Sequence, residues 1–271
     1  MEIQIANNEL IKPLPKLRSV SQSKFEKVAC EAGLDPDNKW IGGYFEYEWT
    51  HLRPLLGAYN LVPHSKQILE FGCNVGASSI VMTALGGSVT GIDIDESIIP
   101  IANANIERYN MKNNIEIKHV ADSSNQPFET NSFDLILANS VLEYVKPNEL
   151  PAIIRELHRV LKPDGQLFIC GTASRIAPKE IHSGRWLVNY LPCAFDRLTG
   201  KNFQRGLNPF LLAGSTDGYF TQTLSSAWQK GREAVHGNLS ISMRMFEQVC
   251  NTMGISPGWV SPHIELLLQK K

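Results

Sequence analysis

Two glycines that follow an apolar run and a carboxylate constrain this chain more than any other feature. Residues 68–76 read ILEFGCNVG, and residues 77–85 have a helical pattern. Glycine permits a tight turn and a close approach of the backbone to a ligand, and the free N–H groups of a following helix point to the same place. The stretch therefore predicts a strand, a glycine turn and a helix N-terminus of an α/β fold, with a ligand at the turn.

The carboxylate of Glu70, which precedes the first glycine, restricts the kind of ligand. A pyrophosphate-binding loop would place no carboxylate there, because the two would repel each other. The dinucleotide pattern G-x-G-x-x-G also fails, since Ala77 stands at the third glycine. S-adenosylmethionine, which has an ammonium group, a sulfonium group and free hydroxyls, fits better. A structural turn without a ligand is the alternative.

Acidic residues end the next two predicted strands. Asp93 lies 21 residues beyond Gly72, the spacing at which an acid accepts hydrogen bonds from both ribose hydroxyls of a nucleotide. Asp122, together with Ser123, ends an alternating run and is placed to accept from the exocyclic amine of an adenine. The alternatives are a helix N-cap for Asp93 and a turn for Asp122 and Ser123.

The region 67–171 resembles the core of the class I S-adenosylmethionine-dependent methyltransferases of the small-molecule type. The resemblance rests on five ordered pieces: LEFGCNVG, VTGIDID, the Asp122–Ser123 pair, NSFDLILANSVLEYV and LHRVLKPDGQLFI. Asn74 stands where the family usually has a third glycine, a mild departure because Asn tolerates positive φ. Tyr144 stands where the family often has His, which puts a base role at that position in doubt.

The resemblance implies an α/β fold with a doubly wound, mainly parallel seven-stranded sheet and helices on both faces. It implies S-adenosyl-L-methionine as cofactor, S-adenosyl-L-homocysteine as product, and no metal. The expected cofactor-binding residues lie in the glycine loop, at the ends of the strands and in the aromatic segment before the core: Glu70, Gly72, Cys73, Asn74, Gly76, Asp93, Ile94, Asp122, Ser123, Asn139 and Tyr44. Packing is the alternative for the aromatic segment.

Four segments are expected along the chain. They are an N-terminal helical cap segment (1–60) with a helix at 21–32, the cofactor-binding core (61–172), a helical cap inserted after the fifth strand (173–240), and a closing segment (241–271). The closing segment should contain a helix at 243–253 and a strand pair, 255–260 and 263–269, whose last strand is antiparallel.

The segment from Thr172 to Ser240 has eight basic and four acidic residues, a net charge of +4, whereas the rest of the chain has −5. A solvated charged face would explain this. The alternative is a cap that attracts an anionic acceptor with an apolar part. We expect Arg185, Trp186 and Tyr190 to bind that acceptor.

Methyl transfer needs alignment of a nucleophile and, where the nucleophile carries a proton, a base. The candidates are His182, because Glu180 lies two residues before it and it follows the fifth strand, and more weakly Tyr144, His158 and His236. A lone loop His is usually a surface residue. We expect transfer to an oxygen of a small or medium-sized acceptor; transfer to nitrogen or carbon, or cofactor binding without turnover, are the alternatives.

Composition excludes several other classes. A net charge of −1 argues against broad nucleic-acid binding. The five cysteines (Cys30, Cys73, Cys170, Cys193 and Cys250) have no metal-ligand spacing, and with no secretory leader in residues 1–17 they predict reduced thiols and a cytoplasmic location. No stretch approaches 18 consecutive apolar residues, so no transmembrane segment is expected.

Overall fold

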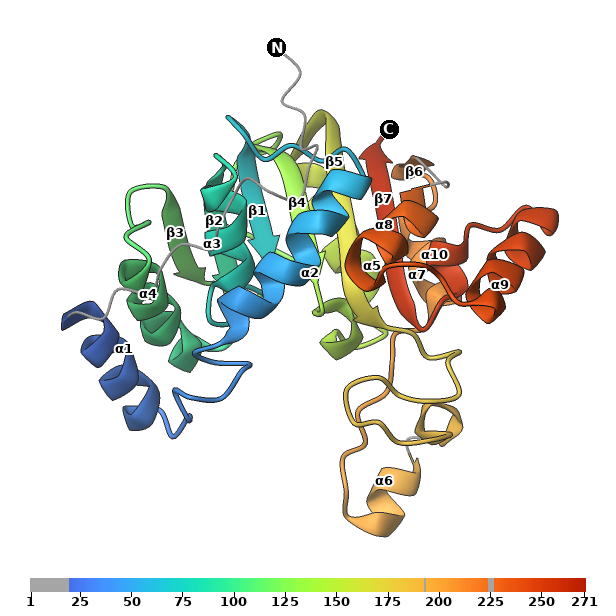
Figure 1. Cartoon of the computed structure of the whole chain (residues 1–271), viewed down its shortest axis with the longest axis horizontal. Coiled ribbons are helices and arrows are strands. Elements are labelled where there is room, and N and C mark those ends of the chain that lie inside the picture. Colours follow the sequence, from blue (N-terminus) through green and yellow to red (C-terminus); the bar gives the residue numbers. More distant parts are fainter. Residues whose placement is uncertain (1–19, 193, 224–226) are drawn as a thin grey trace. The chain divides into compact units, whose positions relative to one another are not determined.

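The computed structural model describes residues 20–192, 194–223 and 227–271. The expectations for residues 1–19, which include the absence of a leader, and for Cys193 lie outside these residues. The chain, which Figure 1 shows whole, divides into two compact units. The first comprises the described residues up to Ala121 together with Lys230–Gly237, and the second comprises Asp122–Gln229, as far as it is described, and Asn238–Lys271.

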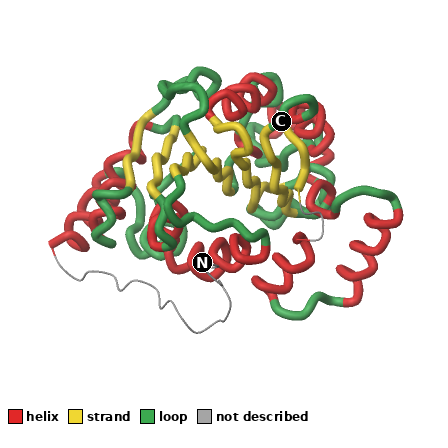
Figure 2. Tube along the Cα trace, turned by 90° about the horizontal axis from the view of Figure 1, so that it is seen from above, coloured by secondary structure: helices red, strands yellow, loops and turns green. Residues whose placement is uncertain are grey.

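The strands form a seven-stranded sheet in the order β3-β2-β1-β4-β5-β7-β6 (yellow in Figure 2). Their bounds are β1 Gln67–Phe71, β2 Ser88–Asp93, β3 Ile115–His119, β4 Phe133–Asn139, β5 Leu161–Ala173, β6 Phe220–Thr223 and β7 His263–Lys270. The β1–β2, β2–β3 and β4–β5 pairs are parallel, and β7 is antiparallel to both β5 and β6. The predicted mainly parallel seven-stranded α/β fold is confirmed, including its antiparallel last strand.

Helices connect and flank the strands. The α-helices are α1 Val20–Glu31, α2 Tyr44–Ala58, α3 Ala77–Ala84, α4 Ile99–Arg108, α5 Leu150–Val160, α6 Ala194–Thr199, α7 Pro209–Thr216, α8 Ala227–His236, α9 Ile241–Thr252 and α10 Pro257–Val260. Short 3-10 turns occur at η1 Glu96–Ile98, η2 Leu142–Tyr144 and η3 Val188–Tyr190. Within the part of the chain that the structure describes, no helix is long and apolar enough to cross a membrane.

In the first unit the helices α1 and α4 pack together beside the three parallel strands. Phe25, Val75 and Ile101 belong to one buried apolar cluster there. Arg108 is almost fully buried beside it, donates to the carbonyl of Gly42 at 2.7 Å and lies over the Phe25 ring at 4.1 Å. The cluster thus fixes the helices that flank the glycine turn, because burial of apolar surface is the main stabilising contribution.

The predicted strand at 255–260 is wrong. Residues 257–260 form the short helix α10, and β7 pairs on one side with β5 and on the other with β6, which comes from the segment assigned to the inserted cap. Proline fixes φ in the helical range and lacks an N–H donor, so Pro257 suits the first turn of a helix and not the interior of a strand pair. β5 begins at Leu161, directly after α5, and continues past an irregularity in its pairing with β4.

A long excursion leaves the second unit's sheet after β5 and returns to its starting point. We define it as residues 175–206; α6 lies at its far end (Figure 1). Its base is closed because the N–H of Leu207 donates to the carbonyl of Ala173 at 2.7 Å, and the N–H of Arg175 to the carbonyl of Leu207 at 2.8 Å. Buried Asn189 ties the interior, donating to the carbonyls of Ser174 and Ala177 and accepting from the N–H of Gly206.

Candidate functional site

The glycine turn of the first unit has three residues in the left-handed region. They are Gly72 (φ 75°), Asn74 (φ 46°) and Gly76 (φ 74°), and α3 begins directly after Gly76. Glycine and Asn are the residues that adopt this conformation with least strain. The sequence prediction of a strand, a turn and a helix N-terminus is confirmed, and the loop's conformation explains why Asn can replace glycine at position 74.

Asp93 holds the turn from the end of β2. Its carboxylate accepts from the N–H of Asn74 at 2.8 Å and from the N–H of Asp95 at 3.1 Å. The carbonyl of Ile92 accepts from both Gly72 and Cys73 at 2.9 Å. The N-cap of the following η1 turn is Asp95, whose carboxylate accepts from the N–H of Ser97. Asp93 thus lies beside the glycine turn, and the ribose role proposed for it stays a prediction.

Glu70 is buried at the end of β1, next to the same turn. The hydroxyl of Ser79 in α3 donates to its carboxylate. Burial raises the pKa of Glu70 to about 8, the Ser79 hydrogen bond counteracts part of that effect, and the nearby carboxylate of Glu48 adds to it. Glu48 in α2 is buried too, and the pKa of Tyr44 is raised by burial and then by Glu48 and Glu70. Buried carboxylates gather here, which suits a cationic ligand.

Other predicted residues of the first unit differ widely in exposure. Cys73 is buried, and burial, followed by the charges of Glu70 and Asp93, raises the pKa of its thiol. Ile94 is 65% exposed immediately after Asp93. The first unit therefore brings Cys73, Asn74 and Asp93 into one turn, with the Glu70 carboxylate on the β1 strand that leads into it.

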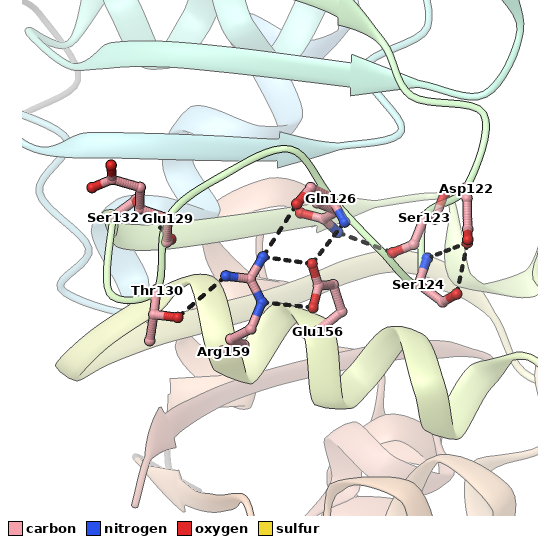
Figure 3. A network of polar contacts seen from close by, with 9 residues as sticks. All are labelled: Asp122, Ser123, Ser124, Gln126, Glu129, Thr130, Ser132, Glu156 and Arg159. Carbon is pink, nitrogen blue, oxygen red and sulfur yellow. Dashed lines mark hydrogen bonds and ion pairs between the residues drawn. The ribbon is translucent and has the colours of Figure 1, made fainter.

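In the second unit, Asp122 and Ser123 begin a loop that a polar network fastens to α5 (Figure 3). The carboxylate of Asp122 accepts from the N–H and the hydroxyl of Ser124, at 2.9 and 2.6 Å. The Arg159 guanidinium donates to both carboxylate oxygens of Glu156 and to the carbonyl of Gln126. The N–H of Gln126 in turn donates to the Glu156 carboxylate at 2.7 Å. Asp122 therefore closes its own turn; the adenine role stays a prediction.

The carboxyl ends of β4 and β5 approach each other closely. Ser140 donates its N–H to the carbonyl of Cys170 at 2.9 Å and its hydroxyl to that of Gly171 at 3.1 Å. Gly171 has φ 64°, and a Cβ on it would meet the side chains of Ser140 and Asn139. A glycine is required here because φ is positive and the end of β4 leaves no space for a side chain.

His182 lies in the excursion and contacts a carboxylate that is 39 residues away in sequence. Its Nε2 lies 2.8 Å from Oε1 of Glu143, a side chain with no exposed surface in η2. The hydrogen bond to Glu143 raises the pKa of His182, against the effect of burial. Glu180, the neighbour that made His182 a candidate, instead accepts from the backbone N–H groups of His182 and Ser183.

Glu143 is the residue that sequence reasoning missed. It belongs to the stretch that follows the apolar strand β4, and a carboxylate at the carboxyl end of such a strand was the one available signal. Its partner comes from the excursion, and sequence spacing carries no information on such a contact. Tyr144 follows it, with its ring centroid 6.3 Å from that of His182. Burial and the charge of Glu143 raise the Tyr144 pKa, so the phenol keeps its proton at neutral pH.

The predicted acceptor-binding residues lie on the surface of the excursion. Trp186 is 68% exposed and Tyr190 is 55% exposed, and the Tyr190 hydroxyl donates to the carbonyl of Ile176 at 2.7 Å. The exposed Arg185 has its guanidinium 5.3 Å from the Phe203 ring. Among the residues that the structure describes, no cluster of three or more His, Cys, Asp or Glu could hold a metal ion.

Comparison with known proteins finds one family match and several similar sequences. Residues 69–169 match the family described as "Methyltransferase domain". An uncharacterized protein of Haemophilus influenzae is 34% identical over 103 residues, which are 38% of this chain and 41% of that protein. A ubiquinone biosynthesis O-methyltransferase of Pseudomonas syringae is 30% identical over 131 residues, 47% of this chain and 54% of that protein. The chain spans about half the length of these curated relatives.

A solved structure extends the likeness beyond the matched region. A Galdieria sulphuraria protein, assigned provisionally as a sarcosine dimethylglycine methyltransferase, has a TM-score of 0.52 at 14% identity, covering 93% of this chain and 98% of that one. At this level of identity the likeness concerns the fold alone.

Proposed function

We propose that the chain transfers a methyl group from S-adenosylmethionine to an oxygen of a small or medium-sized acceptor. Residues 69–169 match the family described as "Methyltransferase domain", and the strands form a mainly parallel seven-stranded sheet. The observation that carries the proposal is the glycine turn fastened to Asp93 within the matched region. Such a turn presents backbone at close range to a nucleoside, with an acidic side chain beside it.

The residues of the turn fit this cofactor. S-adenosylmethionine, when bound, supplies a methyl group on a positively charged sulfur that departs as a neutral thioether. Glu70 and the turn would hold its amino acid part, because a cation beside the buried Glu70 carboxyl favours its ionised form. Asp93 would accept from the ribose hydroxyls, and Asp122 and Ser123 from the adenine amine. The contacts expected to complete the cofactor set come from Tyr44, Cys73, Asn74, Ile94 and Asn139.

The remaining task of the chain is to align the acceptor and to remove a proton. A neutral hydroxyl group is a weak nucleophile, so methylation of a hydroxyl oxygen benefits from a general base that removes its proton. His182 would serve as that base, with Tyr144 beside it. The Glu143–His182 pair supports a hydroxyl acceptor over a carboxylate, which has no proton to remove, and the name of the Pseudomonas syringae relative supports oxygen over carbon. Arg185, Trp186 and Tyr190 would recognise an acceptor that combines an anionic group with an apolar part.

The test is transfer of label from methyl-labelled S-adenosylmethionine to a fractionated metabolite extract, followed by mass spectrometry of the labelled product. A product heavier by one methyl on oxygen supports the proposal. A methyl on nitrogen or carbon would move the chain to another branch of the same fold. Binding of the cofactor without any labelled product would indicate a protein that senses S-adenosylmethionine.

A further inference from the structure

A buried carboxylate with no role in the sequence prediction makes the closest contact to the His182 ring. Oε1 of Glu143 lies 2.8 Å from Nε2 of His182 and also accepts, at 3.4 Å, from the N–H of Ala173 at the end of β5. The Glu143 side chain has no exposed surface, whereas the His182 side chain is one-third exposed. One edge of the imidazole is therefore held by the protein, and the exposed third of the side chain is open to another molecule.

The contacts of the ring distinguish its two nitrogens. Glu143 occupies Nε2, and within the part of the chain that the structure describes Nδ1 has no hydrogen-bond partner. The carboxylate of Glu180 is engaged with two backbone N–H groups and does not contact the ring. A carboxylate that accepts from one ring nitrogen fixes the proton there and leaves a lone pair on the other.

We propose that Glu143 is a positioning residue that keeps the His182 proton on Nε2 and so presents Nδ1 as the atom that takes the proton of the acceptor hydroxyl. The proposal rests on the proposed function. In the transfer, the O–H bond of the acceptor breaks and its proton goes to Nδ1, while the oxygen pair forms the bond to the methyl carbon and the carbon–sulfur pair stays on sulfur. The imidazolium so formed lies against the Glu143 carboxylate, which compensates its charge.

The charged and titratable groups that face His182 are Glu143 from η2, Glu180 from its own loop and Tyr144. Both carboxylates favour the imidazolium, and the hydrogen bond to Glu143 is the larger contribution. A base works only when it is unprotonated, so the rate should fall as the pH falls through the raised pKa of His182. Removal of the Glu143 charge should move that fall to lower pH.

The first experiment does not use turnover. Nitrogen NMR on the full chain with labelled histidine, assigned by the loss of signals in His182→Ala, reports the tautomer and the titration of His182. The expected result is a proton on Nε2 in the neutral ring, and in Glu143→Gln a lower titration midpoint with the tautomer preference weakened. A neutral wild-type ring with its proton on Nδ1 would overturn the inference without any need for the variant to fold.

The second experiment measures kcat against pH in wild type, Glu143→Gln and a control, Glu149→Gln. Glu149 lies six positions later, its side chain is 45% exposed and it is paired with Lys146, so its variant removes the same charge outside the Glu143–His182 pair. For Glu143→Gln we expect the acidic limb to move to lower pH and the plateau kcat to fall about tenfold or more, though less than the roughly 10²–10⁴-fold expected for loss of a general base. Glu149→Gln should match wild type.

The two experiments separate the failure of each proposal. Methyl transfer with an acidic limb that stays in place in Glu143→Gln would overturn the positioning role and leave the methyltransferase function standing. A wild type that transfers no methyl group to any acceptor would refute the function, while the NMR experiment would still decide whether Glu143 sets the tautomer and the titration of His182.

Discussion

Asp93 links the turn and the proposed ribose site through a single side chain. Its two oxygens accept from Asn74 and Asp95. Asp93→Ala should therefore weaken S-adenosylmethionine binding by about 1.5–3 kcal/mol, the range for hydrogen bonds to charged groups. Calorimetric titration, with circular dichroism to verify folding, measures this. An affinity equal to wild type would remove Asp93 from the cofactor site.

Glu70 should make the stability of the free protein depend on pH. Its pKa rises from about 4.5 to about 8 on folding, so the folded chain binds the proton more tightly than the unfolded chain. The contribution is fully present below about pH 4.5 and is lost as the pH rises through about 8. Denaturant titrations over this range should show a decline that is absent in Glu70→Gln. If the stability of wild type and of Glu70→Gln changed with pH in the same way, the raised pKa of Glu70 would be contradicted.

The same carboxylate should discriminate between charged and neutral ligands. Glu70→Gln preserves the shape and removes a carboxyl group that can ionise when a cation binds beside it, so it should weaken a ligand that carries the methionine ammonium more than an analogue that lacks it. Competition binding with both ligands measures the difference. Equal weakening would mean that Glu70 acts on the shape of the turn through Ser79.

At the residue scale, the sequence predicts backbone conformation better than it predicts which side chains contact each other. The turn residues Gly72 and Asn74 could be assigned because their conformations depend on neighbours in sequence. The pairing of Glu143 with His182 could not, because only tertiary structure brings them together. The closeness of Glu180 in sequence was misleading, since a carboxylate two residues before an amide closes a turn with the backbone.

At the scale of elements, Arg159 and Glu156 fasten the loop after β3 to α5 (Figure 3). Arg159→Ala should leave the nearly buried Glu156 with only the Gln126 N–H and lower the free energy of unfolding by about 1–3 kcal/mol. Denaturant unfolding measures this, and hydrogen exchange at the Gln126 N–H should accelerate. The exposed Arg155 on the same helix provides the control, Arg155→Ala. Equal stability of both variants would contradict the role of the network.

Elements with a clear periodicity, including the helix at 243–253 and the last strand, could be predicted from the sequence, and the short strand β6 could not. The predicted helix at 21–32 agrees with α1 to within a residue at each end, and the predicted helix at 243–253 agrees with α9 to within two residues. β6 has only four residues, too few for a pattern, and its place is set by pairing with β7. The expected helical caps and the segment boundaries stay predictions.

At the scale of the whole molecule, the proposed division of labour predicts separable effects on binding and turnover. His182→Ala should reduce kcat roughly 10²–10⁴-fold, the usual contribution of a general base, with cofactor affinity near wild type. Because the pKa of His182 is raised, wild-type activity should decline toward acid through a point above the ordinary imidazole value. Calorimetry and a pH–rate profile measure both. A collapse of cofactor affinity in this variant would refute the division.

Arg185→Ala tests the recognition of the acceptor. Loss of a charge-assisted contact at this exposed position should raise the KM for the acceptor on the order of tenfold, with kcat and cofactor affinity little changed. Removal of the anionic group from the acceptor should erase the difference between variant and wild type. Lys201→Ala, on the same excursion, is the control. A KM unchanged by Arg185→Ala would place acceptor recognition elsewhere.

The hydrogen bonds that close the base of the excursion affect how related proteins can vary in evolution. The residues on either side, Ala173 and Leu207, are hydrogen-bonded neighbours at 2.7 Å, so the chain needs only a short turn to join them. Insertion, deletion or replacement of the intervening residues leaves the β5–β7 register untouched, and a longer closed loop adds little entropic cost. Relatives with the same sheet are therefore expected to differ most in the length and composition of the excursion. Exchange of the excursion between relatives should then alter which acceptor is methylated.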